Sequence, residues 1–252
     1  MLAASRAKLL ESIRPEDKVL EIGGWADPFE RADWVMDLMP FETRGLYERS
    51  GWTENEHRGP ERFSEERWVQ RDICDREPFP FADEEFDFVI CSHTLEDIRD
   101  PIWVCSEMAR IARAGYVETP SLLEELSYGF QGPLAGWGHH RWLVEIDQDR
   151  RHIRFVFKDH TLHHRPEAHF PRGFRRLLSE RERVATLWWR GDFSCEERHF
   201  IGVGPAEQYL QEFVRAELSR RSLPTDAATR PRTGVRRALA RLRSGLRMRR
   251  RA

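Results

Sequence analysis

A short apolar run near the middle of the chain constrains the fold more than any other feature. Residues 86–91 read Phe-Asp-Phe-Val-Ile-Cys, with a single charged residue among them. Such nearly continuous apolar runs are typical of strands covered on both faces, as in parallel sheets with helices on either side. We therefore predict a central strand at residues 86–91.

The other predicted strands alternate with helical segments. Apolar residues recur at helical spacing over 100–112, and Gly115 is expected to end this helix. Alternating strands and helices indicate parallel crossover units, so we expect an α/β, Rossmann-like fold with a mostly parallel seven-stranded sheet and helices on both faces. The predicted strands are residues 19–22, 34–37, 67–70, 86–91, 116–119, 184–189 and 198–203.

The pattern changes in the second half of the chain. Residues 141–147 and 152–158 flank a polar Gln-Asp-Arg-Arg segment and predict a β-hairpin. We interpret this hairpin as part of an inserted cap over about 128–170. Helices are expected near 172–182 and over 206–220, the latter with one apolar side.

Polar and glycine residues follow the ends of the first four predicted strands. An open parallel sheet binds nucleotide-like ligands beyond the carboxyl ends of its strands, so these residues are expected to share one ligand site. Each of them alone has an ordinary structural explanation, such as capping a helix, and their joint placement is what favours function. The residues concerned are Glu21, Gly23, Gly24, Asp37, Asp72, Ser92 and His93.

Four segments, in order, resemble the successive motifs of class I S-adenosylmethionine (SAM)-dependent methyltransferases. They cover roughly residues 17–121 and read VLEIGGWADPF, WVMDLMP, RDICDREPFPFADEEFDFVICSHTLEDIRDP and GYVETPS. The third segment is the most discriminating, and it resembles the small-molecule, methyltransferase type 11-like branch of the family. The last segment resembles members associated with cell-surface sugar or lipid modification, a link by association only.

The resemblance implies SAM as the cofactor. In this interpretation Glu21 orients the amino or ribose end of SAM, and Asp37 accepts hydrogen bonds from the ribose hydroxyls. Asp72 binds the adenine amino group beside the backbone of Ile73, and the glycines let the backbone approach the cofactor. The implied cofactor-binding set is Glu21, Gly23, Gly24, Asp37, Asp72, Ile73 and Ser92.

Methyl transfer requires an in-line approach of the acceptor to the sulfonium methyl group, with a base needed only for weakly acidic hydroxyls. Histidine is the natural base near neutral pH. The candidate catalytic residues are His93, His139 and His140, and Glu118 is a further candidate. The predicted function is methyl transfer to a small-molecule acceptor or to a glycan or lipid of the cell surface.

Trp25 keeps two alternatives open, because it stands where the family's first turn usually has a further glycine. The indole either obstructs the cofactor or stacks over it. An obstructed turn would make the chain a catalytically impaired, methyltransferase-like binding or scaffold protein. A nicotinamide (NAD(P))-dependent oxidoreductase is less favoured, because Trp25 and Pro28 stand where a dinucleotide-binding turn needs its second and third glycines.

Metal binding is not expected from the sequence. Seven histidines lie within 139–169, but none forms a clean helical pair among acidic ligands, and the four cysteines lie far apart. There is no apolar run long enough to span a bilayer and no signal-peptide core, so a cytoplasmic location is expected.

The end of the chain is rich in arginine, with ten Arg and no acidic residue in 230–252. Val235, Leu239, Leu242 and Leu246 form an apolar helical stripe, so the tail either stays disordered or lies over 232–251 on an anionic surface at the inner face of a membrane. Nucleic acid is a less favoured partner. The predicted domains are a methyltransferase-like domain over 1–205, a C-terminal helix and linker over 206–226, and the Arg-rich tail over 227–252.

Overall fold

The computed structural model describes residues 1–50 and 59–224, so the Arg-rich tail over 227–252 lies outside the described residues. The α-helices are α1 (Ala3–Ser12), α2 (Leu46–Arg49), α3 (Pro101–Ile111), α4 (Leu122–Glu125) and α5 (Val203–Arg220). The strands are β1 (Val19–Ile22), β2 (Trp34–Asp37), β3 (Trp68–Gln70), β4 (Phe88–Ser92), β5 (Ala114–Pro120), β6 (Trp142–Asp147), β7 (His152–Phe157), β8 (Val184–Arg190) and β9 (Ser194–Glu197). The short 3-10 helices are η1 (Phe41–Thr43), η2 (Glu65–Arg67), η3 (His160–His164), η4 (Pro166–Ala168), η5 (Phe174–Leu177) and η6 (Arg181–Arg183).

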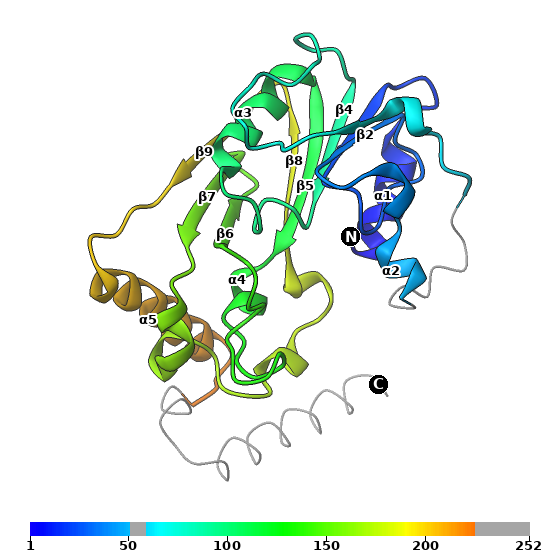
Figure 1. Cartoon of the computed structure of the whole chain (residues 1–252). Helices are drawn as coiled ribbons and strands as arrows, with labels where there is room; N and C mark the ends of the chain where they lie inside the picture. Colours follow the sequence, from blue (N-terminus) through cyan, green and yellow to red (C-terminus); the bar gives the residue numbers. More distant parts are fainter. Residues whose placement is uncertain (51–58, 225–252) are drawn as a thin grey trace. The chain divides into compact units, whose positions relative to one another are not determined.

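The main sheet has the strand order β3-β2-β1-β4-β5-β8 (Figure 1). The first five strands along the chain run parallel to one another, and β8 pairs antiparallel with β5. The predicted Rossmann-like α/β fold is therefore confirmed. The strand number differs from the prediction, because within residues 1–50 and 59–224 this sheet has six strands rather than seven.

The missing strand is the one predicted at 198–203. Ile201 is 97% exposed and Gly202 has a φ of 88°, so this segment offers no buried apolar face to a sheet. The strand nearby is β9, which pairs in parallel with β7. Two further local predictions fail. Only the short η5 and η6 occur over 172–182, and Gly115 lies inside β5 instead of ending α3.

Both faces of the main sheet are buried, which explains the apolar run that defines β4. Val89 and Cys91 belong to one hydrophobic cluster, called here the α3-side core, which includes apolar residues of α3. Phe88 and Ile90 belong to a second cluster, called here the α1-side core, with Leu9 of α1. Figure 1 shows α1 and α3 on opposite sides of the sheet. Because successive side chains of a strand point to opposite faces, a strand covered on both sides must be apolar throughout.

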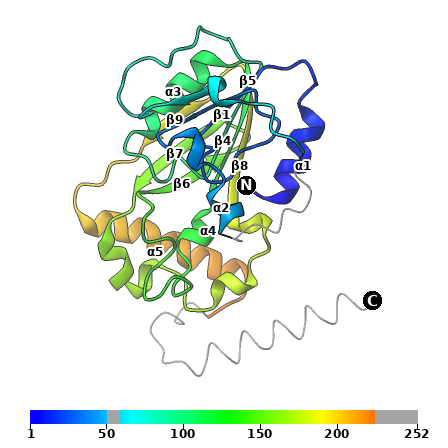
Figure 2. The same ribbon diagram turned by 45° about the vertical axis from the view of Figure 1, so that its right-hand side comes forward.

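The predicted hairpin is present as β6 and β7, which pair antiparallel from Trp142–Phe157 to Asp147–His152. Together with β9 they form a separate three-stranded sheet. Trp142 and Phe155 are part of the α3-side core, and Figure 2 shows these strands on the same side of the main sheet as α3. The hairpin therefore buries its apolar side chains against the main sheet's own core.

The described chain divides into two compact units that interleave along the sequence. The first consists of Met1–Leu122, His139–Phe157 and Glu180–Arg198, and the second of Leu123–Gly138, Lys158–Ser179 and the chain from His199. All residues of the predicted site lie in the first unit. Inside the second unit, the buried Lys158 ammonium lies 2.5 Å from the Glu125 carboxylate and also donates to the carbonyl of Trp137. The predicted domain division at 205 and 226 stays a prediction.

No helix within residues 1–50 or 59–224 is long and apolar enough to cross a membrane.

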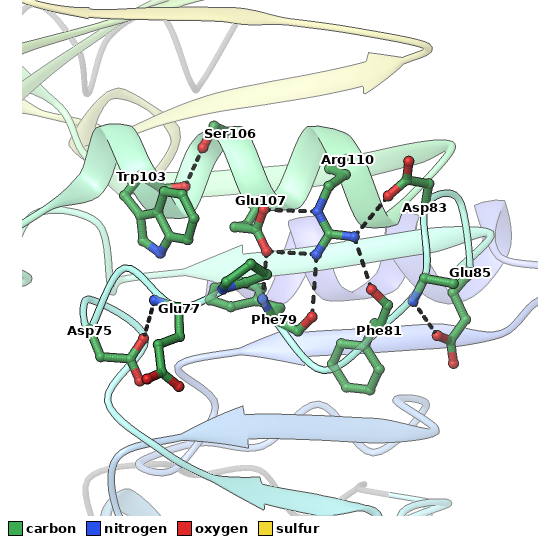
Figure 3. A network of polar contacts seen from close by, with 12 residues as sticks. Asp75, Glu77, Phe79, Phe81, Asp83, Glu85, Trp103, Ser106, Glu107 and Arg110 are labelled. Atoms are coloured by element: carbon green, nitrogen blue, oxygen red, sulfur yellow. Dashed lines mark hydrogen bonds and ion pairs between the residues drawn. The ribbon is translucent and has the colours of Figure 1, made fainter.

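A polar network fixes the segment between β3 and β4 to α3. The Glu107 carboxylate accepts hydrogen bonds from the Phe79 N–H at 2.6 Å and from two nitrogens of Arg110 at 2.8 and 2.6 Å. Arg110 also donates to the carbonyl of Phe81 and to Asp83 (Figure 3). Burial alone would raise the pKa of Glu107, but the hydrogen bonds from Arg110 and Phe79 outweigh it and lower that pKa. The segment leading into β4 is thus held at several points.

We expect Glu107→Gln to lower the free energy of unfolding by about 2 kcal/mol, because the buried charged hydrogen bonds are lost. The stabilisation by Glu107 needs the ionised carboxylate. This stabilisation is therefore fully present above the ordinary glutamate pKa and is lost as the pH falls through the lowered pKa of Glu107 in the folded protein. The difference in stability between the unmodified protein and Glu107→Gln should therefore shrink in acid. Urea unfolding followed by tryptophan fluorescence measures the free energy of unfolding and its dependence on pH. Arg150→Ala, at an exposed ion pair, is the control and should cost no more than about 0.5 kcal/mol. Equal stability of the two variants would contradict the prediction.

Candidate active site

The turn after β1 lies directly against the turn after β4. Gly23 has a φ of 77°, and its N–H donates to the carbonyl of Met36 at 2.9 Å. The Thr94 hydroxyl donates to the carbonyl of Gly23 at 3.3 Å, and a Cβ on Gly23 would lie 2.0 Å from that hydroxyl oxygen. Glycine is required here for both reasons, the left-handed backbone and the close approach of Thr94.

Glu21 is buried in β1 and holds the far side of the first turn. Its Oε2 accepts a hydrogen bond from the N–H of Phe29 at 2.7 Å, and Gly24 packs against the same carboxylate. Burial raises the pKa of Glu21 to about 7, although the hydrogen bond from Phe29 and the charge of Arg6 act in the opposite direction. Glu21 is therefore poised to change its charge near neutral pH.

Asp37, the last residue of β2, holds the backbone of the first turn. It accepts hydrogen bonds from the N–H groups of Trp25 at 3.0 Å and Met39 at 2.8 Å, and burial raises its pKa in spite of them. The Trp25 indole donates to the Thr43 hydroxyl at 3.0 Å and packs against the α1-side core. The tryptophan at this glycine position thus has a structural role that requires no ligand.

Asp72 lies two residues beyond β3. One of its carboxylate oxygens lies 2.7 Å from the Arg99 guanidinium, and the other accepts the N–H of Cys74 at 2.9 Å. The side chain of Ile73 is buried in the α3-side core. At the edge formed by the carboxyl ends of β1 to β4, Asp72 is the carboxylate already paired with an arginine.

Ser92 ends β4 with a buried hydroxyl. Its Oγ has no hydrogen-bond partner among the residues that the structure describes. A buried hydroxyl without a partner costs about 1–3 kcal/mol, so it indicates a position where a bound group supplies the missing hydrogen bond.

His93 follows Ser92 with a φ of 52°, which is unusual for a residue with a side chain. Its N–H donates to the carbonyl of Glu118 at 2.8 Å, and its Nε2 lies 3.1 Å from the carboxylate of Glu118. Its Nδ1 lies 3.4 Å from Glu96 Oε1. The backbone and both ring nitrogens therefore hold the imidazole between two buried glutamates.

His93 and Glu118 each stabilise the charged form of the other. Burial alone would lower the pKa of His93, but the hydrogen bond to Glu118 and the negative charge of Glu96 outweigh it and raise that pKa to about 9. Burial likewise favours a protonated Glu118, but its hydrogen bonds with His93 and Tyr116 lower its pKa to about 2. At neutral pH the pair is an imidazolium beside a carboxylate, so neither group is suited to accept a proton.

The remaining candidate bases lie next to this turn. The carbonyl of Glu96 accepts hydrogen bonds from the N–H groups of Arg141 at 2.8 Å and Trp142 at 3.1 Å, which brings the preceding histidines to the end of β4. His140 Nε2 lies 3.9 Å from Asp97 Oδ1. The ring centroids of His139 and His140 are 4.5 Å apart.

Sequence reasoning assigned no role to Thr94, Glu96 or Asp97, which together position most of these groups. Glu96 belongs to the His-x-Leu-Glu turn of the resembling segment, so a signal for it existed. Asp97 carried no such signal, because its histidine neighbours lie more than 40 residues away along the chain.

We expect the imidazole of His93 to titrate with a midpoint near 9, well above the ordinary 6.5. Glu118→Gln should move this midpoint down, because it removes a charge that favours the imidazolium. NMR of the imidazole resonances over pH measures both values. Tyr116→Phe is the control, since it removes a different hydrogen bond of Glu118 and keeps the charge. A midpoint at or below 6.5 in the unmodified protein would show that the two glutamates do not stabilise the His93 imidazolium.

Comparison with known proteins gives one family match. A model described as a methyltransferase domain matches residues 52–117. No curated protein matches the chain.

Among solved structures, the YcgJ protein of Bacillus subtilis is 18% identical over 48% of this chain and 52% of that chain, with a TM-score of 0.34. A SAM-dependent methyltransferase of Aquifex aeolicus is 14% identical over 46% of this chain and 64% of that chain, with a TM-score of 0.33. An arsenic(III) SAM methyltransferase of Chlamydomonas reinhardtii is 16% identical over 46% of this chain and 43% of that chain, with a TM-score of 0.31. The chain spans about half the length of the first solved structures it matches.

The matched segment contains β3, β4, α3 and the first half of β5, and so includes the turn that carries Ser92 and His93. It follows β1, which contains Glu21, and β2, which ends in Asp37, and the parallel strands of this sheet have the order β3-β2-β1-β4-β5. Residues 52–117 are therefore similar to a methyltransferase domain, and the strands among them lie in a sheet of the Rossmann-like type.

Proposed function

We propose that this chain binds SAM at the carboxyl edge of its main sheet and transfers the methyl group to an acceptor that meets the turn after β4. The observation that carries the proposal is the buried hydroxyl of Ser92 without a partner, at the end of the central strand. Carboxylates lie at or near the carboxyl ends of β1, β2 and β3, at the same edge. In open parallel sheets this edge is where nucleotide-like ligands bind.

The residues present fit an adenosyl ligand with an amino-acid end. Glu21 would hold the amino end, Asp37 the ribose hydroxyls, and Asp72 the adenine amino group beside the backbone of Ile73. Gly23 and Gly24 provide the close backbone approach, and Ser92 gains the hydrogen bond that its buried hydroxyl lacks. Bound SAM supplies an activated methyl group on a sulfonium.

Three groups of this chain would handle the acceptor. The His93 imidazolium keeps its place between Glu96 and Glu118 and acts as a fixed positive charge, and its protonated state argues against a role as base. A proton released by a hydroxyl acceptor would pass to His139 or His140. The resemblance of the segment around Glu118 and Thr119 favours a small molecule, or a cell-surface glycan or lipid, as the acceptor class.

The Arg-rich segment 232–251 lies outside the described residues. A cytoplasmic location, with peripheral attachment to an anionic inner membrane surface through this segment, stays part of the proposal.

We expect S-adenosylhomocysteine, the demethylated product, to bind and raise the melting temperature, and NAD to do neither. Asp37→Asn should weaken binding at least tenfold, because the charged acceptor of the ribose hydroxyls is lost. Calorimetry measures the affinities, and Asp149→Asn on an exposed turn is the matched control. If neither SAM nor its product binds at millimolar concentration, the scaffold alternative replaces the enzyme.

We further expect the affinity for S-adenosylhomocysteine to weaken as the pH falls below about 7. Glu21 has a pKa of about 7 without ligand, and once protonated it no longer attracts the ligand's ammonium group. Calorimetry across this pH range should therefore show tighter binding on the alkaline side. Glu21→Gln should abolish the pH dependence.

5′-Methylthioadenosine separates the two orientations of the ligand, since it keeps the ribose and lacks the amino-acid end. Its affinity should not change over the same pH range. An equal pH dependence for this compound would place Glu21 at the ribose instead of the amino end.

A further inference from the structure

A second group of side chains at the end of β4 has the composition of a metal site. One ligand atom each from Asp97, His139 and His140 lies within 4.8 Å of the other two. His140 Nε2 lies 3.9 Å from Asp97 Oδ1. The two imidazole rings meet edge to face, at 77°. None of these residues belongs to the set proposed to hold SAM.

The backbone holds the two contributing segments together on both sides of this group. The N–H of Asp97 donates to the carbonyl of Thr94 at 3.1 Å, which closes the turn after β4. The Glu96 carbonyl accepts the N–H groups of Arg141 and Trp142, directly after the histidines. The indole of Trp142 donates to the carbonyl of Ile98, directly after the aspartate, at 2.8 Å. The backbone of the segments that carry the three side chains is therefore held in place before any ion binds.

We propose that Asp97, His139 and His140 bind a divalent transition-metal cation of the Zn²⁺ type. Two imidazole nitrogens and one carboxylate oxygen are a ligand set that suits such ions. Three protein ligands leave coordination positions open, as in sites where the metal also binds a further molecule. Mg²⁺ and Ca²⁺ prefer oxygen ligands alone, so they are poor occupants.

The distances allow binding after a small rearrangement. Metal–ligand bonds of about 2.0–2.1 Å in a tetrahedron separate neighbouring ligand atoms by about 3.3 Å. The three atoms must therefore close in by roughly 1 Å. His140 is buried and anchors the site, whereas the His139 side chain is exposed. The side chain of Asp97 is 39% exposed, so the ion has a path from solvent.

The sequence-based expectation of no metal rested on the absence of a helical histidine pair. Two adjacent histidines completed by an aspartate from a distant turn show no such spacing, so the sequence could not reveal this group. Metal binding does not depend on the proposed methyl transfer. In the metal-bound protein His139 and His140 would not serve as the proton acceptor, because their lone pairs bind the ion. A further step would be that an oxygen atom of the methyl acceptor binds the metal ion at an open coordination position. This step rests on the proposed function.

Zn²⁺ binding to the full-length, untagged protein, freed of metal by chelation, tests the proposal. Calorimetry should find one Zn²⁺ equivalent, and the absorption of bound Co²⁺ should show the d–d bands of a protein-ligated ion. Mg²⁺ should give no heat of binding. His139→Ala and Asp97→Asn should each weaken Zn²⁺ binding at least tenfold. His164→Ala, an exposed histidine in the second unit, is the matched control and should leave the affinity unchanged.

Three outcomes would overturn the proposal: no Zn²⁺ binding, unchanged binding in both His139→Ala and Asp97→Asn, or loss of binding in His164→Ala. The test does not rely on His140→Ala, whose buried position makes folding uncertain. Binding of S-adenosylhomocysteine, measured on the same samples, separates this result from the proposed function, since either property can fail without the other.

Discussion

The contact between the Gly23 backbone and the Thr94 side chain joins the two turns on which the whole site depends. Gly23 follows the strand that carries Glu21, and Thr94 follows the strand that carries Ser92. Because both faces of the sheet are filled by apolar side chains, the polar groups of the site gather at its carboxyl edge and not on its faces. The hydroxyl of Thr94 sets the distance between the two turns, and everything that binds at this edge must fit that spacing.

Similar residues take different charges at this edge because their surroundings differ. Glu21 and Glu118 are both buried, but one has a pKa of about 7 and the other about 2. The difference arises from His93, whose imidazolium lies against Glu118. Glu21 has a backbone N–H and a more distant arginine in place of such a contact. The same side-chain chemistry thus provides a permanent anion at one position and a titrating group at the other.

Much of the fold could be predicted from local patterns, because they record burial directly. The run 86–91 indicated a strand covered on both faces, and the hairpin was visible as two apolar segments around a polar turn. The strand at 198–203 failed because its apolar residues face solvent, which composition alone does not show.

Some residues of the candidate site could likewise be predicted from local sequence, and others could not. Glu21, Asp37 and Ser92 were found because each lies at or next to the carboxyl end of a strand, a position that sequence can mark. The structural role of Trp25 depends on Thr43, and the surroundings of His140 depend on Asp97. Contacts between segments far apart along the chain leave no pattern in a single sequence, so these could be seen only in the folded chain.

The left-handed backbone of His93 affects how its side chain can be studied. Glycine and asparagine adopt this conformation readily, whereas an alanine there carries a penalty of roughly 1 kcal/mol. An alanine exchange at this position would mix the loss of the imidazole with a disturbance of the main chain. Asparagine removes the positive charge and preserves the path of the turn, so it separates what the ring contributes from what the backbone contributes.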